Sequence, residues 1–194
     1  MIKIGQIGLN FGLKTHIPSF KNDSRFELVS VCSQDIANAK KISEDLSVLH
    51  YTNNPRDLFP KVDAVSFAIP PSEQSKWVSE AVNNGLHVFF EKPLGYIPRK
   101  SNLIQSSQAL MVDFELLEID LWKMLFNLIK KGDLGEILHC EVIWNVETYA
   151  VSNNIKSWKT DINRDGGTLK NFGSHVFYYL EEWIPMLYIS LRDF

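Results

Sequence analysis

The sequence predicts an α/β protein built on a doubly wound parallel sheet, and three observations support this fold class. Short apolar runs rich in β-branched and aromatic residues recur through the first half of the 194 residues. Longer segments with helical periodicity separate these runs, and a glycine-containing turn follows the first run. Strands that alternate with helices form right-handed βαβ units, which make neighbouring strands parallel.

The elements expected in the first half follow one another closely. Strands are expected at residues 2–9, 26–33, 63–69, 86–91 and 109–116. Helices are expected at residues 35–46 and 72–85, and Gly85 is placed to end the second helix.

The second half predicts a different and incomplete domain. A helix is expected over residues 117–132, a long strand over 136–150 and a further helix from Asn171. A long strand needs neighbouring strands, and residues 184–194 offer only one short candidate. We therefore predict one domain at residues 1–115, followed at residues 116–194 by a partial α+β domain for substrate binding or dimerisation.

Composition and charge exclude several classes of function. The net charge is −3 and no basic block is long, so nucleic acid is not an expected partner. No apolar run approaches the ~20 residues of a membrane helix, and the N-terminus lacks a secretory pattern. Cys32 and Cys140 have no metal-ligand spacing. We expect a cytoplasmic, reduced protein without a metal.

The turn at residues 8–13 is similar to the Gly-x-Gly-x-x-Gly turn of dinucleotide-binding folds. Gly8 keeps the first glycine, which permits the tight turn out of the strand. Asn10 stands at the second position, and asparagine tolerates a left-handed backbone better than most residues. Leu13 stands at the third, where a small residue packs helix against strand, while Gly12 can restore some backbone freedom. An ordinary strand–helix turn is the alternative.

Two later motifs add chemistry. Glu91, Lys92 and Pro93 follow a predicted strand, at the end where open α/β sheets bind ligands. A lysine there can donate to a hydroxyl or carbonyl oxygen and relay a proton, although a solvated turn is the alternative. Asn171 and His175 stand four residues apart on a predicted helix. His175 is a candidate general acid or base, with a structural histidine as the alternative.

Taken together and in this order, the motifs resemble those of the Gfo/Idh/MocA oxidoreductase family. The matching positions are His16 and Pro18, Ala68-Ile69-Pro70-Pro71, Glu91-Lys92-Pro93 and Gly173-Ser174-His175. The resemblance implies a Rossmann-type domain that binds NAD or NADP and a second domain that holds the substrate. It implies hydride transfer between the nicotinamide and a sugar, polyol or nucleotide-sugar derivative.

The resemblance also assigns roles to individual residues. It places Lys92, His175 and Asn171 in the catalytic group, where the family has aspartate instead of Asn171. Gln74 replaces a usual histidine. The implied cofactor-binding residues are Gly8, Asn10, Phe11, Gly12, Ser33, Ala68, Pro70, Gln74, Glu91 and Lys92.

The end of the second predicted strand bears on the choice of cofactor. NAD enzymes place an acid there for the ribose 2′-hydroxyl, whereas this chain has Ser33, followed by Gln34 and Asp35. A serine removes the repulsion that excludes the 2′-phosphate of NADP. No arginine is present to pair with that phosphate, so the sequence favours NADP only slightly.

Other interpretations stay open at this point. The short second domain is also consistent with a truncated, non-catalytic dinucleotide-binding remnant, or with a module that depends on a partner. A generic α/β domain without a nucleotide is a third interpretation. A long strand with an uncovered edge would pair with another copy of the chain, which predicts a homo-oligomer through the C-terminal sheet.

Overall fold

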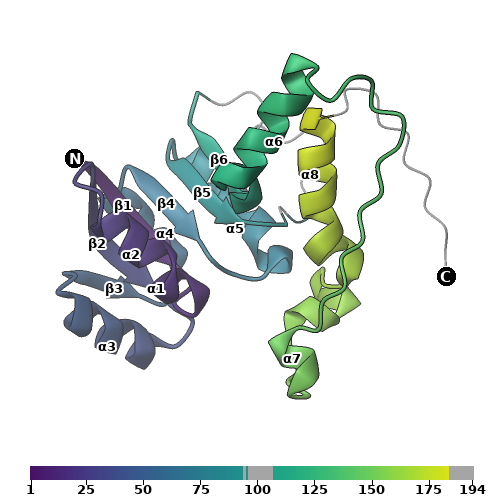
Figure 1. Cartoon of the computed structure of the whole chain (residues 1–194). Coiled ribbons are helices and arrows are strands. Elements are labelled where there is room, and N and C mark those ends of the chain that lie inside the picture. Colours follow the sequence, from purple (N-terminus) through teal and green to yellow (C-terminus); the bar gives the residue numbers. More distant parts are fainter. Residues whose placement is uncertain (94, 96–106, 184–194) are drawn as a thin grey trace. The chain divides into compact units, whose positions relative to one another are not determined.

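The computed structural model describes residues 1–93, 95 and 107–183 (Figure 1). Its chain divides into two compact units, Met1–Asp113 and Phe114–Phe194. The sequence prediction put the boundary after residue 115. The strand expected within residues 184–194 lies outside the described residues.

The first unit is built on a six-stranded parallel sheet with the order β3-β2-β1-β4-β5-β6. Its strands are β1 Ile2–Ile7, β2 Phe26–Cys32, β3 His50–Thr52, β4 Ala64–Phe67, β5 His87–Glu91 and β6 Leu110–Asp113. Because β1 lies between β2 and β4, the strand order reverses beside β1. The predicted doubly wound sheet is confirmed, and it has its topological switch point between β1 and β4.

Helices cover both faces of this sheet and bury two apolar clusters. The helices are α1 Phe11–Lys14, α2 His16–Lys21, α3 Ile36–Leu46, α4 Pro55–Leu58 and α5 Pro71–Asn83. Val31 and Cys32 are adjacent in β2 yet belong to different clusters, because successive side chains of a strand point to opposite faces. Asp35 begins α3 as its N-cap, with its carboxylate accepting from the Ala37 and Asn38 amides.

The regular elements of the second unit are helical over its described residues. It contains α6 Asp120–Lys131, α7 Tyr149–Ser152, α8 Ser174–Trp183 and a π-helix η6 at Leu169–Gly173, together with the 3-10 turns η3 Glu115–Glu118, η4 Trp158–Thr160 and η5 Ile162–Arg164. Trp122 of α6 packs against Tyr179 and Trp183 of α8, with ring centroids 4.8 and 4.9 Å apart. Of the helices in the described ranges, none is both long and apolar enough to cross a bilayer.

Two parts of the chain differ from the predicted elements. The β-prone run at residues 136–150 forms no strand, because no neighbouring strand is found among the described residues of its unit. Conversely, β3 was not predicted, since its three residues are too few to show a period of two. The helix predicted from Asn171 begins as the π-helix η6 and continues as α8.

The central strand β4 lies in the apolar core of the first unit. All four of its residues are buried, and the Phe67 ring is fully excluded from water. We expect Phe67→Ala to lower the free energy of unfolding by about 3–5 kcal/mol, because it leaves a cavity in a packed core. Urea denaturation measures the change. Leu49→Ala, at a 99% exposed leucine, is the control and should change it by less than about 0.5 kcal/mol.

Candidate functional site

The turn after β1 requires glycine at residue 8. Gly8 has φ +90°, a conformation that L side chains rarely adopt. A Cβ added there would overlap the Ala68 carbonyl, lying 2.7 Å from its carbon. Gly8 N donates to Cys32 O at 3.0 Å, and Ala68 N donates to Ile7 O at 2.8 Å. The turn is therefore held against the carboxyl ends of β2 and β4, at the switch point of the sheet.

Asn10 and Gly12 play parts that differ from the predicted ones. Asn10 lies in the right-handed region (φ −87°, ψ −76°) and makes no side-chain cap, so it does not replace a left-handed glycine. Gly12 is the residue that packs closely: a Cβ there would lie 2.8 Å from Gln6 Cδ and 3.3 Å from Ala68 Cβ. The helix-packing role expected at Leu13 thus falls on Gly12, while Leu13 packs against the apolar cluster around Ile17.

Gln74 links the start of α5 to the end of β5. Pro70 precedes α5, and its carbonyl accepts from the amide of Gln74 at 3.0 Å. The fully buried Gln74 side chain donates through Nε2 to the carbonyls of Glu91 and Pro93. Its other atom, Oε1, accepts no hydrogen bond within the described residues. This amide fixes the backbone on both sides of Lys92 and leaves one buried acceptor unsatisfied.

His16 is a buried imidazole bound by side chains of three neighbouring strands. Its Nδ1 lies 2.8 Å from Ser66 Oγ of β4, and its Nε2 lies 2.8 Å from Glu91 Oε1 of β5. Asp113 Oδ2 of β6 is 3.7 Å from the same Nε2. Ligand atoms of His16, Glu91 and Asp113 lie within 4.8 Å of one another, so the group has metal-ligating chemistry, but the imidazole itself already bridges the carboxylates.

The surroundings of His16 favour its protonated form. Burial is the largest single contribution and lowers the pKa of the imidazole. The nearby Asp113 carboxylate and the hydrogen bond to Glu91, together with the negative charges of both carboxylates, outweigh it and raise the pKa above the usual value of 6.5. A protonated His16 donates from both ring nitrogens and neutralises part of the charge of the carboxylate pair.

Ser33 directly follows the carboxyl end of β2, which is the position that bears on the choice between NAD and NADP. Ser33 N donates to Thr52 O at 3.2 Å, and Ser33 Oγ accepts from the Asp35 amide at 3.3 Å. Gln34 reaches across this edge, and its Nε2 donates to Glu73 Oε2 of α5 at 3.0 Å. A carboxylate from α5 is therefore tied to the residue that follows Ser33.

The predicted catalytic residues fall in the two different units. Lys92 is partly buried and directly follows β5 in the first unit. Asn171 and His175 are both buried in the second unit, in η6 and in the first turn of α8. The His175 ring lies 5.8 Å from the Phe114 ring and 5.9 Å from the Trp144 ring, centroid to centroid. The meeting of Lys92 with Asn171 and His175 stays a prediction.

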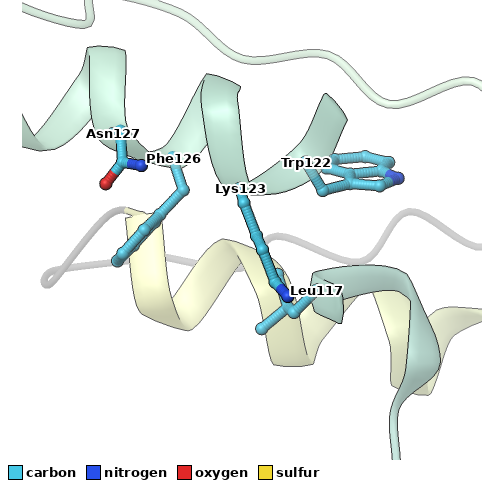
Figure 2. A pocket seen from close by; sticks show the side chains of 5 residues that line it. All are labelled: Leu117, Trp122, Lys123, Phe126 and Asn127. Carbon is cyan, nitrogen blue, oxygen red and sulfur yellow. The ribbon is translucent and has the colours of Figure 1, made fainter. Parts of the chain in front are cut away.

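A hollow of about 260 Å³ lies beside α6 in the second unit. Figure 2 shows its lining side chains, which come from η3 and α6: Leu117, Trp122, Lys123, Phe126 and Asn127. Lys123 also pairs with Glu118 at 2.9 Å. None of the predicted site residues belongs to this hollow.

The remaining predicted residues of the first unit lie along the carboxyl edge of the sheet. Phe11 is half exposed, and its ring lies 5.7 Å from the His16 ring. Ala68 follows β4 and contacts the turn at Gly8. The sequence reasoning did not assign Gln6, Asp113 or Glu73 to the site. Glu73 follows the Pro70-Pro71 pair in the sequence, but no local signal shows its partner, 39 residues away.

These features fit a dinucleotide. Gly8 leaves a side-chain-free turn at the switch point, where ligands bind in such sheets. Two buried amide oxygens, Gln6 Oε1 and Gln74 Oε1, lack a donor within the described residues, and a bound group with N–H or O–H donors would satisfy them. The fold and the site together define a dinucleotide-binding domain of Rossmann type.

Comparison with known proteins identifies the family. The Gfo/Idh/MocA oxidoreductase family matches with its NAD-binding Rossmann fold over residues 2–107 and with its C-terminal alpha/beta domain over residues 127–193. The chain belongs to the Gfo/Idh/MocA oxidoreductase family, as the sequence motifs indicated.

Individual relatives are similar to the chain over much of its length. An uncharacterised oxidoreductase of Synechocystis sp. is 27% identical over 190 residues, covering 94% of this chain and 51% of that protein. Among solved structures, scyllo-inositol dehydrogenase from Lactobacillus casei with bound NAD(H) and scyllo-inositol has a TM-score of 0.77 at 19% identity, over 94% of this chain and 56% of that one.

A 3-ketoreductase from Actinomadura kijaniata, in complex with NADP and TDP-benzene, has a TM-score of 0.59 at 23% identity, over 68% of this chain and 42% of that one. These two likenesses show the fold. The chain spans about half the length of the curated relatives it matches.

The raised pKa of His16 makes the stability of the first unit depend on pH. A base whose pKa is higher in the folded than in the unfolded state stabilises the fold below the unfolded pKa, and the benefit is lost as pH rises through the folded pKa. We therefore expect the urea midpoint to fall as pH rises from 6.5 to 7.5, a range in which few unfolded thiols ionise.

His16→Gln should lower the midpoint at pH 6.5 and flatten its pH dependence, because glutamine holds no charge. His139→Gln, at an exposed histidine of the second unit, is the matched control and should keep the slope. An undiminished slope in His16→Gln would contradict the assignment of the charge to His16.

Proposed function

We propose that the protein is an NAD(P)-dependent oxidoreductase that transfers a hydride between a nicotinamide cofactor and a sugar, polyol or nucleotide-sugar derivative. The observation that carries the proposal is the Gly8 turn, held against Ala68 at the switch point, with Lys92 after a neighbouring strand of the same sheet. Membership of the Gfo/Idh/MocA oxidoreductase family supports the same conclusion.

The cofactor would lie along the carboxyl edge of the sheet. Gly8, Phe11 and Gly12 would border it at the first turn, and Ser33 would border its adenosine ribose. The group beyond β4 comprises Ala68, Pro70 and Gln74, and Gln74 Oε1 offers a buried acceptor. Asn10 would border the cofactor as the residue before α1. Glu91 would act on the cofactor site by fixing the end of β5 before Lys92. When bound, a nicotinamide cofactor supplies the hydride acceptor or donor.

Proton transfer is the part of the reaction that the chain's own side chains would perform. Lys92 is proposed to hold the reacting hydroxyl or carbonyl oxygen through its ammonium group and to take or give the proton there. His175 is the proposed second acid or base. Asn171 can orient a partner through its amide but cannot accept a proton at neutral pH, so it is proposed as a positioning residue.

The choice between NAD and NADP belongs to this proposal as well. Similar proteins are seen with either cofactor: the L. casei structure holds NAD(H), and the A. kijaniata structure holds NADP. Considered alone, Ser33 favours NADP slightly, because it brings no negative charge to the ribose 2′-position. The proposal also includes a small sugar-like substrate, a cytoplasmic location and self-association through the C-terminal domain.

The cofactor site is tested by titrating the folded chain with NADH and NADPH, following energy transfer from its five tryptophans. We expect saturable binding of at least one nucleotide. Gly8→Ala should weaken that binding at least tenfold, because the methyl group meets the Ala68 carbonyl and closes the turn.

Gly85→Ala is the matched control. Gly85 also has a positive φ, +80°, but no atom lies within 4 Å of an added Cβ. Both variants therefore bear backbone strain, and only Gly8→Ala obstructs the site. Equal affinities in the two variants, or no binding of either nucleotide by folded wild-type chain, would contradict the cofactor site; the second result would favour the non-catalytic remnant.

Lys92 is tested by its replacement with methionine. Lys92→Met should lower hydride transfer to a panel of sugars, polyols and nucleotide sugars by roughly 10²–10⁴-fold, and this loss should be much larger than any loss of NADH affinity. Absorbance at the nicotinamide band measures the rate. Lys76→Met, at an exposed lysine of α5, is the control and should keep the rate; an equal loss in both variants would argue against a role for Lys92 in proton transfer.

A further inference from the structure

No acid stands directly after β2. Dinucleotide-binding folds that select NAD place an acid there to accept from the ribose 2′-hydroxyl. Ser33 stands at that end, and the next acid along the chain, Asp35, is engaged elsewhere. Its Oδ1 accepts from Ala37 N at 2.9 Å and from Asn38 N at 3.3 Å, which caps α3. Asp35 therefore caps α3 through one oxygen, and it stands two residues beyond Ser33, where the usual acid would be.

Glu73 brings a carboxylate to this place from a different element. It lies in the first turn of α5 and is partly buried. Gln34 Nε2 donates to its Oε2 at 3.0 Å, which ties the carboxylate to the residue after Ser33. The second oxygen, Oε1, accepts no hydrogen bond from the described residues. The arrangement thus presents one anchored oxygen and one free acceptor at the edge of β2.

We propose that Glu73 is a specificity-determining residue that takes the place of the missing β2 acid and selects NAD(H) over NADP(H). The inference rests on the proposed dinucleotide-binding function. In NAD(H), the adenosine ribose has two free hydroxyl groups, and a carboxylate accepts from such a diol. In NADP(H), the 2′-oxygen bears a phosphate with a charge of about −1.5 to −2, which Glu73 repels.

The residues directly after Ser33 supply no cation to offset that repulsion. Residues 33–39 contain no lysine or arginine, and the side chain next to Ser33 is the amide that holds Glu73. The slight preference for NADP inferred from Ser33 alone is therefore reversed once Glu73 is taken into account. In this proposal, the negative charge that other folds place at the end of β2 comes from Glu73 of α5.

The experiment compares dissociation constants of NADH and NADPH for wild type and Glu73→Gln. Glutamine has the same side-chain length as glutamate and can still accept a hydrogen bond from Gln34. The substitution therefore removes the negative charge and keeps the contact with Gln34. We expect wild type to bind NADH at least tenfold more tightly than NADPH, and Glu73→Gln to reduce this ratio at least tenfold, as for the loss of a charged hydrogen-bond acceptor.

Glu80→Gln is the control, since it removes one negative charge from the same helix at a residue paired with Arg56; its ratio should equal that of wild type. Gln34→Ala is a second variant. It unties Glu73 without changing its charge, and it should reduce the ratio by less than Glu73→Gln does.

The outcomes separate this inference from the proposed function. An unchanged ratio in Glu73→Gln, or tighter NADPH binding by wild type, overturns the role of Glu73 while leaving a dinucleotide site in place. Absence of binding of either nucleotide by the folded chain overturns the proposed function and this inference with it. A ratio that falls in Glu73→Gln and stays constant in Glu80→Gln supports the inference.

Discussion

The charge balance around His16 is the interaction on which the carboxyl edge of the sheet depends. Glu91 and Asp113 lie directly opposite each other in the register of β5 and β6, and like charges in opposite positions of a sheet repel. The imidazole of His16 lies between them and also meets Ser66 of β4. One buried imidazole, whose pKa is raised by these carboxylates, thus links the ends of three adjacent strands, and Lys92 follows directly from one of them.

The first turn of α5 joins the two sides of the same edge. Gln74 points inward and binds the carbonyls of Glu91 and Pro93, while Glu73, one residue earlier, meets Gln34 beyond β2. Successive residues of a helix point about 100° apart, so one turn can contact strands on both sides of the switch point. Gln74, which stands where the resemblance implies a histidine, therefore makes a contact with the end of β5 that does not depend on protonation.

The sequence predicted the parts of this arrangement that local patterns encode. The alternating strands and helices of the first unit and the need for Gly8 follow from periodicity and turn chemistry. The roles of Gly12 and Glu73, and the bond between His16 and Glu91, 75 residues apart, come from tertiary contacts that no local pattern records. The run at 136–150 failed as a strand prediction because β-propensity describes a residue's fit to a sheet, and a sheet needs partners.

Asn171 bears on how such a site would move protons. It is buried in a π-helix, a rare form often found at functional sites, so its position is specialised even though its chemistry is neutral. An amide donates and accepts hydrogen bonds at every pH, whereas an aspartate changes its charge. A chain with an amide here can orient a neighbouring group but cannot share its proton. In the proposed reaction the acid–base role would then fall on Lys92 and His175, and the pH dependence of turnover would report these two groups.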